Sequence, residues 1–398
     1  MNSDLSSQTN KKLTKQTLLF VVAIFLIATI LRTPLTVVGP AIPFIRADLG
    51  ISNTLAGFLT TIPLLAFAVI SPFAASIARK LGMENTLFYS VIFLAIGIIL
   101  RSTGVAFLLI AGTILIGIAI SFANVLIPSY FKLKFPLHIG LLMGIYTVSM
   151  NLSAGLAVGI SHPIASSSWG WQGALGFSII LCLITLAAWL PLLRSNKVEM
   201  IGPSAKQPRA KLSRSGLAWT VALTMGFQSF FFYSLATWLP EILVSQGITP
   251  EKAGWLTMLS QFAQIPMTFI VPIIASRLSS QRPIAVFFII CYFIGYAGLL
   301  MEWTSLVIIW MIFLGFAGGA SFSLCMMLFT LRTKTAYEAA ELSGFAQSIG
   351  YLLAAVGPIA LGYIHDATGD WYVPNVMFII ITVILFITSM ISSQNRTI

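Results

Sequence analysis

One charged residue lies in a stretch that is otherwise apolar. The segment "FLIATILRTPLTVVGPAIPF", residues 25–44, contains Arg32 as its single ionisable side chain. A charge at the centre of a membrane-spanning helix costs about 2.5–3.5 kcal/mol on insertion scales, so it needs a partner or a ligand. A guanidinium offers five donors and no acceptor, which suits anions and other groups that accept hydrogen bonds. Arg32 is therefore the first candidate for a binding residue.

The depth of Arg32 favours this interpretation. Counted from a helix start near residue 18, it lies about 21 Å along, past the middle of a hydrocarbon core about 30 Å thick. All eleven Asp and Glu residues fall in loops or at the ends of apolar runs. Alternatively, Arg32 binds backbone carbonyls freed by Pro34 and Pro40. We expect an anion-binding or acceptor-binding residue, because unpaired intramembrane charges usually mark a substrate path.

Uncharged polar side chains at membrane depth could complete the site. Each could instead bond a neighbouring helix, for about 0.6 kcal/mol, and the two uses are equally compatible with the sequence. The predicted substrate-binding residues are Arg32, Asn124, Tyr146, Gln228, Gln264, Gln347 and Tyr351. In the aromatic run 227–238, Tyr233 and Trp238 are predicted to cap the cavity, or else to pack against helices and lipid. A pocket with one cation and several hydrogen-bond donors suits a compact anion or a neutral molecule that accepts hydrogen bonds. It suits an organic cation poorly.

The elements that must position these residues are membrane helices. Of 398 residues, 58% are apolar and 8% charged, whereas a soluble domain carries about 25% charged residues. Runs of about 20 apolar residues predict an all-α integral membrane protein. The twelve predicted spans are 18–42, 54–77, 86–103, 106–128, 140–161, 173–193, 216–240, 253–276, 283–301, 305–328, 342–363 and 373–391.

The basic residues predict the orientation of these spans. The net charge is +11, but the Lys and Arg residues occupy short gaps between apolar runs, which argues against a nucleic-acid partner. With both termini in the cytoplasm, 18 of the 22 fall on the cytoplasmic side, whereas Arg46, Arg101 and Lys252 fall outside. This asymmetry predicts a multi-pass protein of the cytoplasmic membrane with lipids as its surroundings.

The chain also divides into two similar halves. The polar, basic segment 194–215 predicts a cytoplasmic linker between an N-terminal bundle, 1–193, and a C-terminal bundle, 216–398. The motif "AGFLT" at 56–60 recurs as "AGWLT" at 253–257, an offset of 197 residues. We therefore predict two pseudo-symmetric six-helix bundles with the substrate site near the midplane between them.

Five stretches carry a resemblance to a known family. They are "LRTPLTVVGP" (31–40), "GFLTTIPLLAFAVISP" (57–72), "NVLIPSYFKLKFP" (124–136), "QSFFFYSLATWLP" (228–240) and "LSGFAQSIGYLLAAVGP" (342–358). The chain resembles the major facilitator superfamily and, within it, the cyanate and 2-nitroimidazole transporter family. That resemblance implies the major facilitator fold, transport by alternating access, and a small anion or acceptor-rich molecule as substrate.

One loop departs from the superfamily pattern. Where that pattern has an Asp, the stretch "ASIARKLG" (75–82) has Arg79. Glu84 could pair with a neighbouring Arg, or the loop could simply be solvated.

The predicted function is that of a secondary active transporter for a small anion or a small polar molecule, cyanate-like or nitroimidazole-like. No catalytic motif is present, and His138, His162 and His365 fall in three separate loops, so we expect no enzyme, cofactor or metal. The alternatives are an efflux transporter for hydrophobic drugs, and a membrane receptor that binds a ligand without moving it. We expect a monomer, and we keep a proton as the candidate coupling ion although no midplane residue supports it.

Overall fold

The structure, a computed structural model, describes residues 15–51, 53–195 and 212–398, and these residues form helices joined by short turns. Helices are expected because lipid offers no hydrogen bonds, so each span must satisfy its backbone internally. The N-terminal bundle contains α1 (Lys15–Thr36), α2 (Val38–Leu49), α3 (Asn53–Leu81), α4 (Met83–Arg101), α5 (Ala106–Lys134), α6 (Ile139–Ala165), α7 (Gly170–Gly176) and α8 (Ser178–Ser195). The C-terminal bundle contains α9 (Gly216–Ser245), α10 (Pro250–Arg277), α11 (Arg282–Leu300), α12 (Val307–Leu331), α13 (Ala336–Thr368) and α14 (Tyr372–Ser392).

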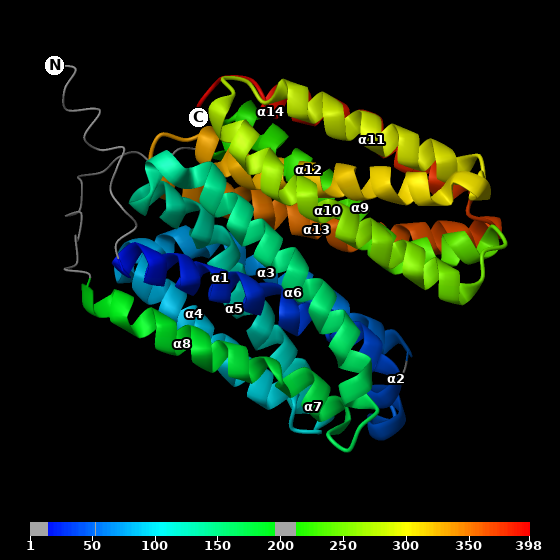
Figure 1. Cartoon of the computed structure of the whole chain (residues 1–398), viewed down its shortest axis with the longest axis horizontal. Coiled ribbons are helices and arrows are strands. Elements are labelled where there is room, and N and C mark those ends of the chain that lie inside the picture. Colours follow the sequence, from blue (N-terminus) through cyan, green and yellow to red (C-terminus); the bar gives the residue numbers. More distant parts are fainter. Residues whose placement is uncertain (1–14, 52, 196–211) are drawn as a thin grey trace.

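The two bundles lie side by side and diverge toward one end of the molecule (Figure 1). We name the end at which α1 begins and α14 ends the inner end, and the opposite end, which holds α2 and α7, the outer end. The bundles meet where α3 packs on α13 and α6 packs on α10. Gly344 of α13 allows this approach, because a Cβ at that position would collide with the Ser71 carbonyl of α3. We call this contact surface the seam.

The helices account for the twelve predicted spans. Ten are long and apolar enough to cross a membrane, and the bent pair α1 and α2 forms an eleventh. The twelfth is α9, a 30-residue helix whose polar side chains lower its hydropathy and which packs against α13, α14 and α10. Several helices extend past the predicted spans. Helix α13 begins at a capping box formed by Thr335 and Glu338 and ends at the left-handed Gly369.

The first predicted span, 18–42, is bent, as its prolines indicated. Helix α1 stops at Thr36, and α2 leaves Val38 at 42° to it. Pro34 and Pro40 lack the amide hydrogens that would bond the carbonyls of Ile30 and Thr36, so the backbone bends between them and the helix restarts. The sixth span, Gly170–Pro191, is a single span with a local interruption at Phe177, between α7 and α8.

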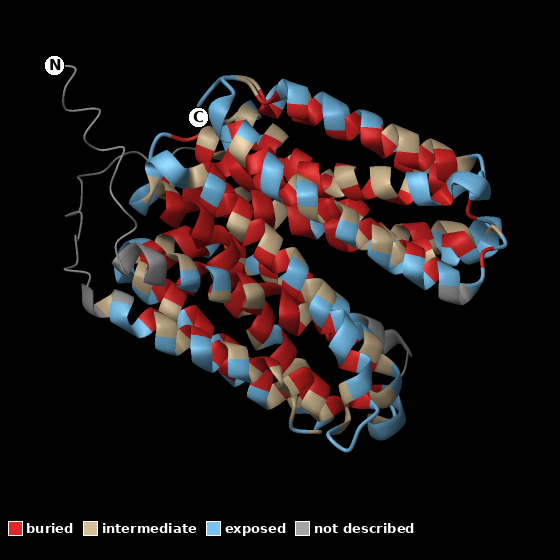
Figure 2. Cartoon of the chain, viewed as in Figure 1, coloured by how far each residue is buried: buried red, intermediate tan, exposed pale blue. Residues whose placement is uncertain are grey.

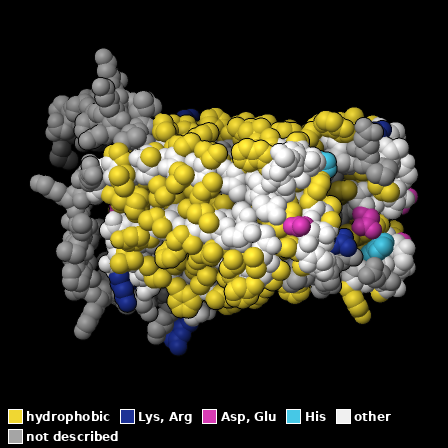
Figure 3. Space-filling model, turned by 90° about the horizontal axis from the view of Figure 1, so that it is seen from below, with side chains coloured by type: hydrophobic (Ala, Val, Ile, Leu, Met, Phe, Trp, Pro, Cys, Tyr) yellow, Lys and Arg dark blue, Asp and Glu magenta, His cyan; other side chains and the backbone are white. Residues whose placement is uncertain are grey.

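Burial follows the bundle geometry. Buried side chains fill the interior of each bundle and the seam, whereas the outward faces are exposed (Figure 2). Many of the exposed side chains are large and apolar, as expected for surfaces that face lipid. In the space-filling view these side chains cover the middle of the molecule, and charged side chains lie toward its ends (Figure 3). The structure is that of a multi-pass membrane protein.

The predicted linker, 194–215, falls mostly on residues 196–211, which lie outside the described residues. Its boundaries, and those of the two predicted domains, therefore stay predictions.

Candidate substrate-binding site

A pocket lies at the seam and is lined from both bundles. Its free volume is about 10 Å³, roughly the room that one water molecule needs. The lining residues are Arg32 (α1), Asn151 (α6), Gln228, Ser229, Phe232 and Tyr233 (α9), Gln264 (α10), Phe322 (α12) and Tyr351 (α13). The lining therefore closes around this space, and a ligand larger than water enters only if lining side chains move.

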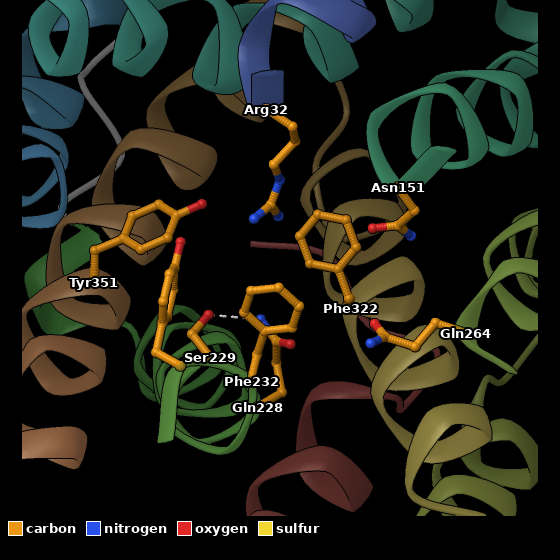
Figure 4. Close-up of a pocket in the computed structure, with 9 residues that line it drawn as sticks. Arg32, Asn151, Gln228, Ser229, Phe232, Gln264, Phe322 and Tyr351 are labelled. Carbon is orange, nitrogen blue, oxygen red and sulfur yellow. Dashed lines mark hydrogen bonds between the residues drawn. The ribbon is translucent and has the colours of Figure 1, made fainter. Parts of the chain in front are cut away.

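Arg32 reaches across the seam into this pocket. Its guanidinium carbon lies 5.3 Å from the centroid of the Phe232 ring and 5.4 Å from that of Phe322, both on the opposite bundle. Figure 4 shows the side chain pointing from α1 toward these rings, with Tyr351 to one side. Cation–π contacts of this kind contribute about 0.5–2 kcal/mol each. They hold the guanidinium in place without neutralising its charge.

The charge of Arg32 has no carboxylate partner among the described residues, whose ion pairs are Arg79 with Glu341 and Lys134 with Glu84. Arg32 is nevertheless buried, with only 9% of its surface exposed. The alternative is that Arg32 binds the backbone carbonyls freed at the bend, but one of these carbonyls already has another donor. The Pro34 carbonyl accepts a hydrogen bond from Arg101 at 2.6 Å. The donors of Arg32 are therefore directed to the pocket.

Two tyrosines stand beside the guanidinium. The Tyr233 hydroxyl lies within electrostatic reach of the Arg32 charge. The rings of Tyr233 and Tyr351 meet edge to face at 6.5 Å, and Tyr351 also packs on Phe67 of α3 at 4.9 Å. These contacts fix both aromatic rings, so the tyrosines form a rigid polar wall of the pocket.

Three amides complete the polar lining. Gln228 Nε2 donates to Ser229 Oγ at 2.6 Å, and Gln264 Nε2 donates to Gln261 Oε1 at 2.6 Å. These bonds use amide hydrogens and leave the glutamine oxygens to accept from a ligand. The Nδ2 of Asn151 has no hydrogen-bond partner among the described residues. It is a free donor on the side of the pocket where Gln264 lies (Figure 4).

The structure brings together five of the residues named from the sequence: Arg32, Gln228, Gln264, Tyr351 and Tyr233. Their role in binding stays a prediction.

Asn124, Tyr146 and Gln347 lie outside the lining and bond one another. The Tyr146 hydroxyl donates to Asn124 Oδ1 at 3.0 Å, and Gln347 Nε2 donates to the Asn124 carbonyl at 3.2 Å. Because Gln347 belongs to α13 and Asn124 to α5, the second bond crosses the seam. This is the helix-to-helix use that the sequence left open for each of these residues.

Trp238 also lies outside the lining. Its Nε1 donates to the Pro358 carbonyl at 2.8 Å, and its ring packs on Trp371 at 5.3 Å, both within the C-terminal bundle. These contacts hold Trp238 within its own bundle and do not place it over the pocket.

Four lining residues were not selected from the sequence: Asn151, Ser229, Phe232 and Phe322. Ser229 could have been found, because it stands 197 residues after Arg32 and so occupies the equivalent position of the second half. The phenylalanines could not, because an aromatic residue in an apolar helix looks the same whether it faces lipid or a cation.

Comparisons with known proteins agree with this architecture. The chain matches the family model of the Major Facilitator Superfamily over residues 24–249 and 221–393. The uncharacterized transporter YycB of Bacillus subtilis (strain 168) is 44% identical over 378 residues, 94% of this chain and 93% of that protein. The 2-nitroimidazole transporter of Escherichia coli (strain K12) is 37% identical over 384 residues, 96% of this chain and 98% of that protein.

The solved structure of the proton:xylose symporter XylE has a TM-score of 0.75 against this chain at 15% identity, covering 95% of this chain and 97% of that one. At this identity the likeness supports the fold alone.

Two bundles of six spans with a polar pocket at their seam define a membrane transport protein. The chain belongs to the major facilitator superfamily. The predicted fold class and the resemblance to the cyanate and 2-nitroimidazole transporter family are both confirmed.

Proposed function

We propose that this protein transports a small anion, or a small polar molecule rich in acceptors, across the cell membrane by alternating access. One observation carries the proposal: Arg32 extends into a pocket shared by both bundles and has no carboxylate partner among the described residues. The substrate supplies the acceptor that the fold does not.

The chemistry of the lining narrows the substrate further. Arg32, the tyrosines and Asn151 present donors, whereas the oxygens of Gln228 and Gln264 remain as acceptors. A compact molecule with a negative or acceptor-rich end and a polar opposite end satisfies both sets. Cyanate-like anions and nitroimidazole-like molecules have this character. An organic cation would be repelled by Arg32, and no lining residue is a carboxylate.

The contacts at the seam support alternating access. At the inner end α3 and α13 are held by the pair Arg79 and Glu341. Nearer the pocket, in the middle of both helices, the Ser348 hydroxyl donates to the Ala68 carbonyl. The bundles diverge toward the outer end (Figure 1). Since the pocket is lined from both sides, rocking of one bundle against the other would change every contact to a bound substrate.

The distribution of basic residues supports an orientation with the inner end and both termini in the cytoplasm. We propose a monomer surrounded by lipid that performs no catalysis. No lining residue is an acid or a histidine, so coupling to protons, if present, must use groups outside the pocket. An inside-negative potential opposes anion entry by about 2.3 kcal/mol per charge per 100 mV. Anion uptake therefore requires a co-ion, a protonated substrate or rapid consumption inside the cell.

The test is uptake of cyanate, nitrate, nitrite and 2-nitroimidazole into vesicles that contain the purified protein. Arg32→Gln keeps a polar side chain and removes the charge, and Arg32→Lys keeps the charge and removes the planar fork. Arg46→Gln, on the exposed side of α2, is the matched control. We expect wild type and the control to transport at least one compound, and Arg32→Gln to lose that transport while unfolding at an unchanged temperature.

Two other outcomes would contradict the proposal. If Arg32→Gln transports normally, Arg32 is a structural residue. If a compound raises the unfolding temperature of the wild type but none of the four is transported, a receptor that binds without transport becomes the better account.

A further inference from the structure

Two spans of the N-terminal bundle are interrupted at the outer end. The first bends by 42° at Val37, between α1 and α2, and the sixth, which is one span, has a local interruption at Phe177, between α7 and α8. The outer pieces pack on each other around Trp171, whose indole donates to the Asp48 carboxylate at 2.8 Å. Their buried side chains, together with a few from α3, α5 and α6, form a hydrophobic cluster separate from the main core. We call α2 and α7 together the outer unit.

One buried cation binds at both interruptions. Arg101, the last residue of α4, is 1% exposed. Its Nη1 donates to the Pro34 carbonyl at 2.6 Å, and its Nη2 donates to the Leu175 carbonyl at 3.4 Å. Pro34 lies at the end of α1 and Leu175 at the end of α7. The guanidinium thus joins the two helix ends at which the spans are interrupted.

These helix ends are suitable partners for a positive charge. The last carbonyls of a helix lack intrahelical donors and carry about half a negative charge. Arg101 has no carboxylate partner among the described residues, so these carbonyls are the groups that compensate its burial. A second side chain acts at the first interruption, since the Ser161 hydroxyl of α6 donates to the Val37 carbonyl at 2.7 Å.

The backbone of Arg101 is itself held firmly. Helices α4 and α5 touch at Gly112, where a Cβ would lie 2.5 Å from the Arg101 nitrogen. The guanidinium therefore projects from a fixed point on α4 to two helix ends. Arg32 stands two residues before Pro34 on the same helix, so whatever fixes the Pro34 carbonyl also fixes the base of the Arg32 side chain.

We propose that Arg101 is a positioning residue for the substrate site. By holding the ends of α1 and α7, it sets the depth and direction of Arg32 in the pocket and fixes the outer unit beside it. The effect on transport rests on the proposed function, whereas the effect on the conformation of α1, α2 and α7 does not.

The chain contains a matched control for this role. Arg332, just after α12, is also buried, at 2% exposure, and its Nε donates to the Ser392 carbonyl at 2.7 Å. It lies at the inner end of the C-terminal bundle and does not contact the pocket. Arg332→Met removes a buried cation from one backbone carbonyl and from the Gln281 side-chain oxygen, so it is a buried-cation loss like Arg101→Met but does not affect α1. A loss of stability alone should therefore appear in both variants.

The experiment compares wild type, Arg101→Met, Arg332→Met and Ser161→Ala by three measurements. Hydrogen exchange followed by mass spectrometry reports on residues 38–49 and 170–176. Phenylglyoxal labelling reports how accessible the Arg32 guanidinium is. Uptake of 2-nitroimidazole gives KM and the maximal rate. If Arg101→Met does not purify as folded protein, Arg101→Lys replaces it, since a single ammonium cannot hold both carbonyls with the same fork.

We expect Arg101→Met to speed exchange in both segments, to raise labelling of Arg32, and to raise KM by about tenfold, as misplaced binding groups commonly do. Ser161→Ala should show the same changes in 38–49, more weakly, and Arg332→Met should show none of them. Unchanged exchange and labelling in folded Arg101→Met would overturn the proposal, as would changes equal to those of Arg332→Met. If wild type transports none of the panel, the proposed function fails, and exchange and labelling still decide the role of Arg101.

Discussion

Arg79 on α3 and Glu341 on α13 form an ion pair that joins the two bundles at the inner end. Neither alternative considered for this loop from the sequence describes it. Glu84 pairs instead with Lys134, at 3.1 Å and within the N-terminal bundle. Arg79, which stands where the superfamily pattern has an Asp, therefore faces Glu341 on the other bundle.

The first prediction concerns this pair. Arg79→Glu and Glu341→Arg each place like charges across the seam, and the double exchange restores an opposite pair. Because the Arg79 side chain is 38% exposed, the pair contributes about 0.2–1 kcal/mol. Each single variant should lower the maximal transport rate by about two- to fivefold, and the double variant should recover most of it. Additive losses in the double variant would mean that the two residues act independently.

The second prediction concerns Lys132, the last-turn lysine of α5. Its ammonium donates to the Thr330 carbonyl at 2.7 Å and also to the Thr333 carbonyl, which caps the end of α12 across the seam. Lys132→Met should speed hydrogen exchange at residues 328–336 and lower the unfolding temperature. Lys134→Met, which breaks a pair inside one bundle, should leave exchange at 328–336 unchanged. Equal effects of the two variants would exclude a specific cap.

The third prediction concerns the rings that hold the Arg32 guanidinium. Phe232→Leu and Phe322→Leu keep apolar volume but remove the π face, so each should weaken substrate binding by about two- to thirtyfold, the equivalent of 0.5–2 kcal/mol. Uptake KM measures the loss. Phe230→Leu, on the same helix but outside the lining, is the control. Equal effects at all three positions would indicate general packing.

The fourth prediction separates a binding amide from a structural one. Asn151 Nδ2 has no hydrogen-bond partner in the described part of the chain, so Asn151→Leu should raise KM without lowering the unfolding temperature. Asn124 accepts from Tyr146 and Gln347. Asn124→Leu leaves the buried Tyr146 hydroxyl without its acceptor, which costs about 1–3 kcal/mol, so unfolding should occur at a lower temperature. Thermal unfolding without ligand measures the stability of both variants, and the shift on adding 2-nitroimidazole measures their binding. If Asn151→Leu loses stability and Asn124→Leu loses only binding, the two roles are exchanged.

Part of the structure can be predicted from the local sequence. Twelve apolar runs, a basic central segment and an isolated Arg32 are visible along the chain, because the cost of placing polar groups in lipid acts on each segment separately. The spans, the two-bundle fold and the position of Arg32 in a pocket could thus be predicted. The repeat offset of 197 residues even places Ser229 opposite Arg32.

Other features exist only after distant segments meet. Phe232 and Phe322 become partners of a cation because α9 and α12 face α1, and Asn124 becomes a bonding residue because Gln347 arrives from α13. Arg101, expected at the outer surface, turns inward because two helices end where its guanidinium can reach them. The sequence by itself determined which groups must be satisfied in the membrane. Only the tertiary structure decided which partners satisfy them, because those partners are hundreds of residues apart in the chain or appear only where a helix ends.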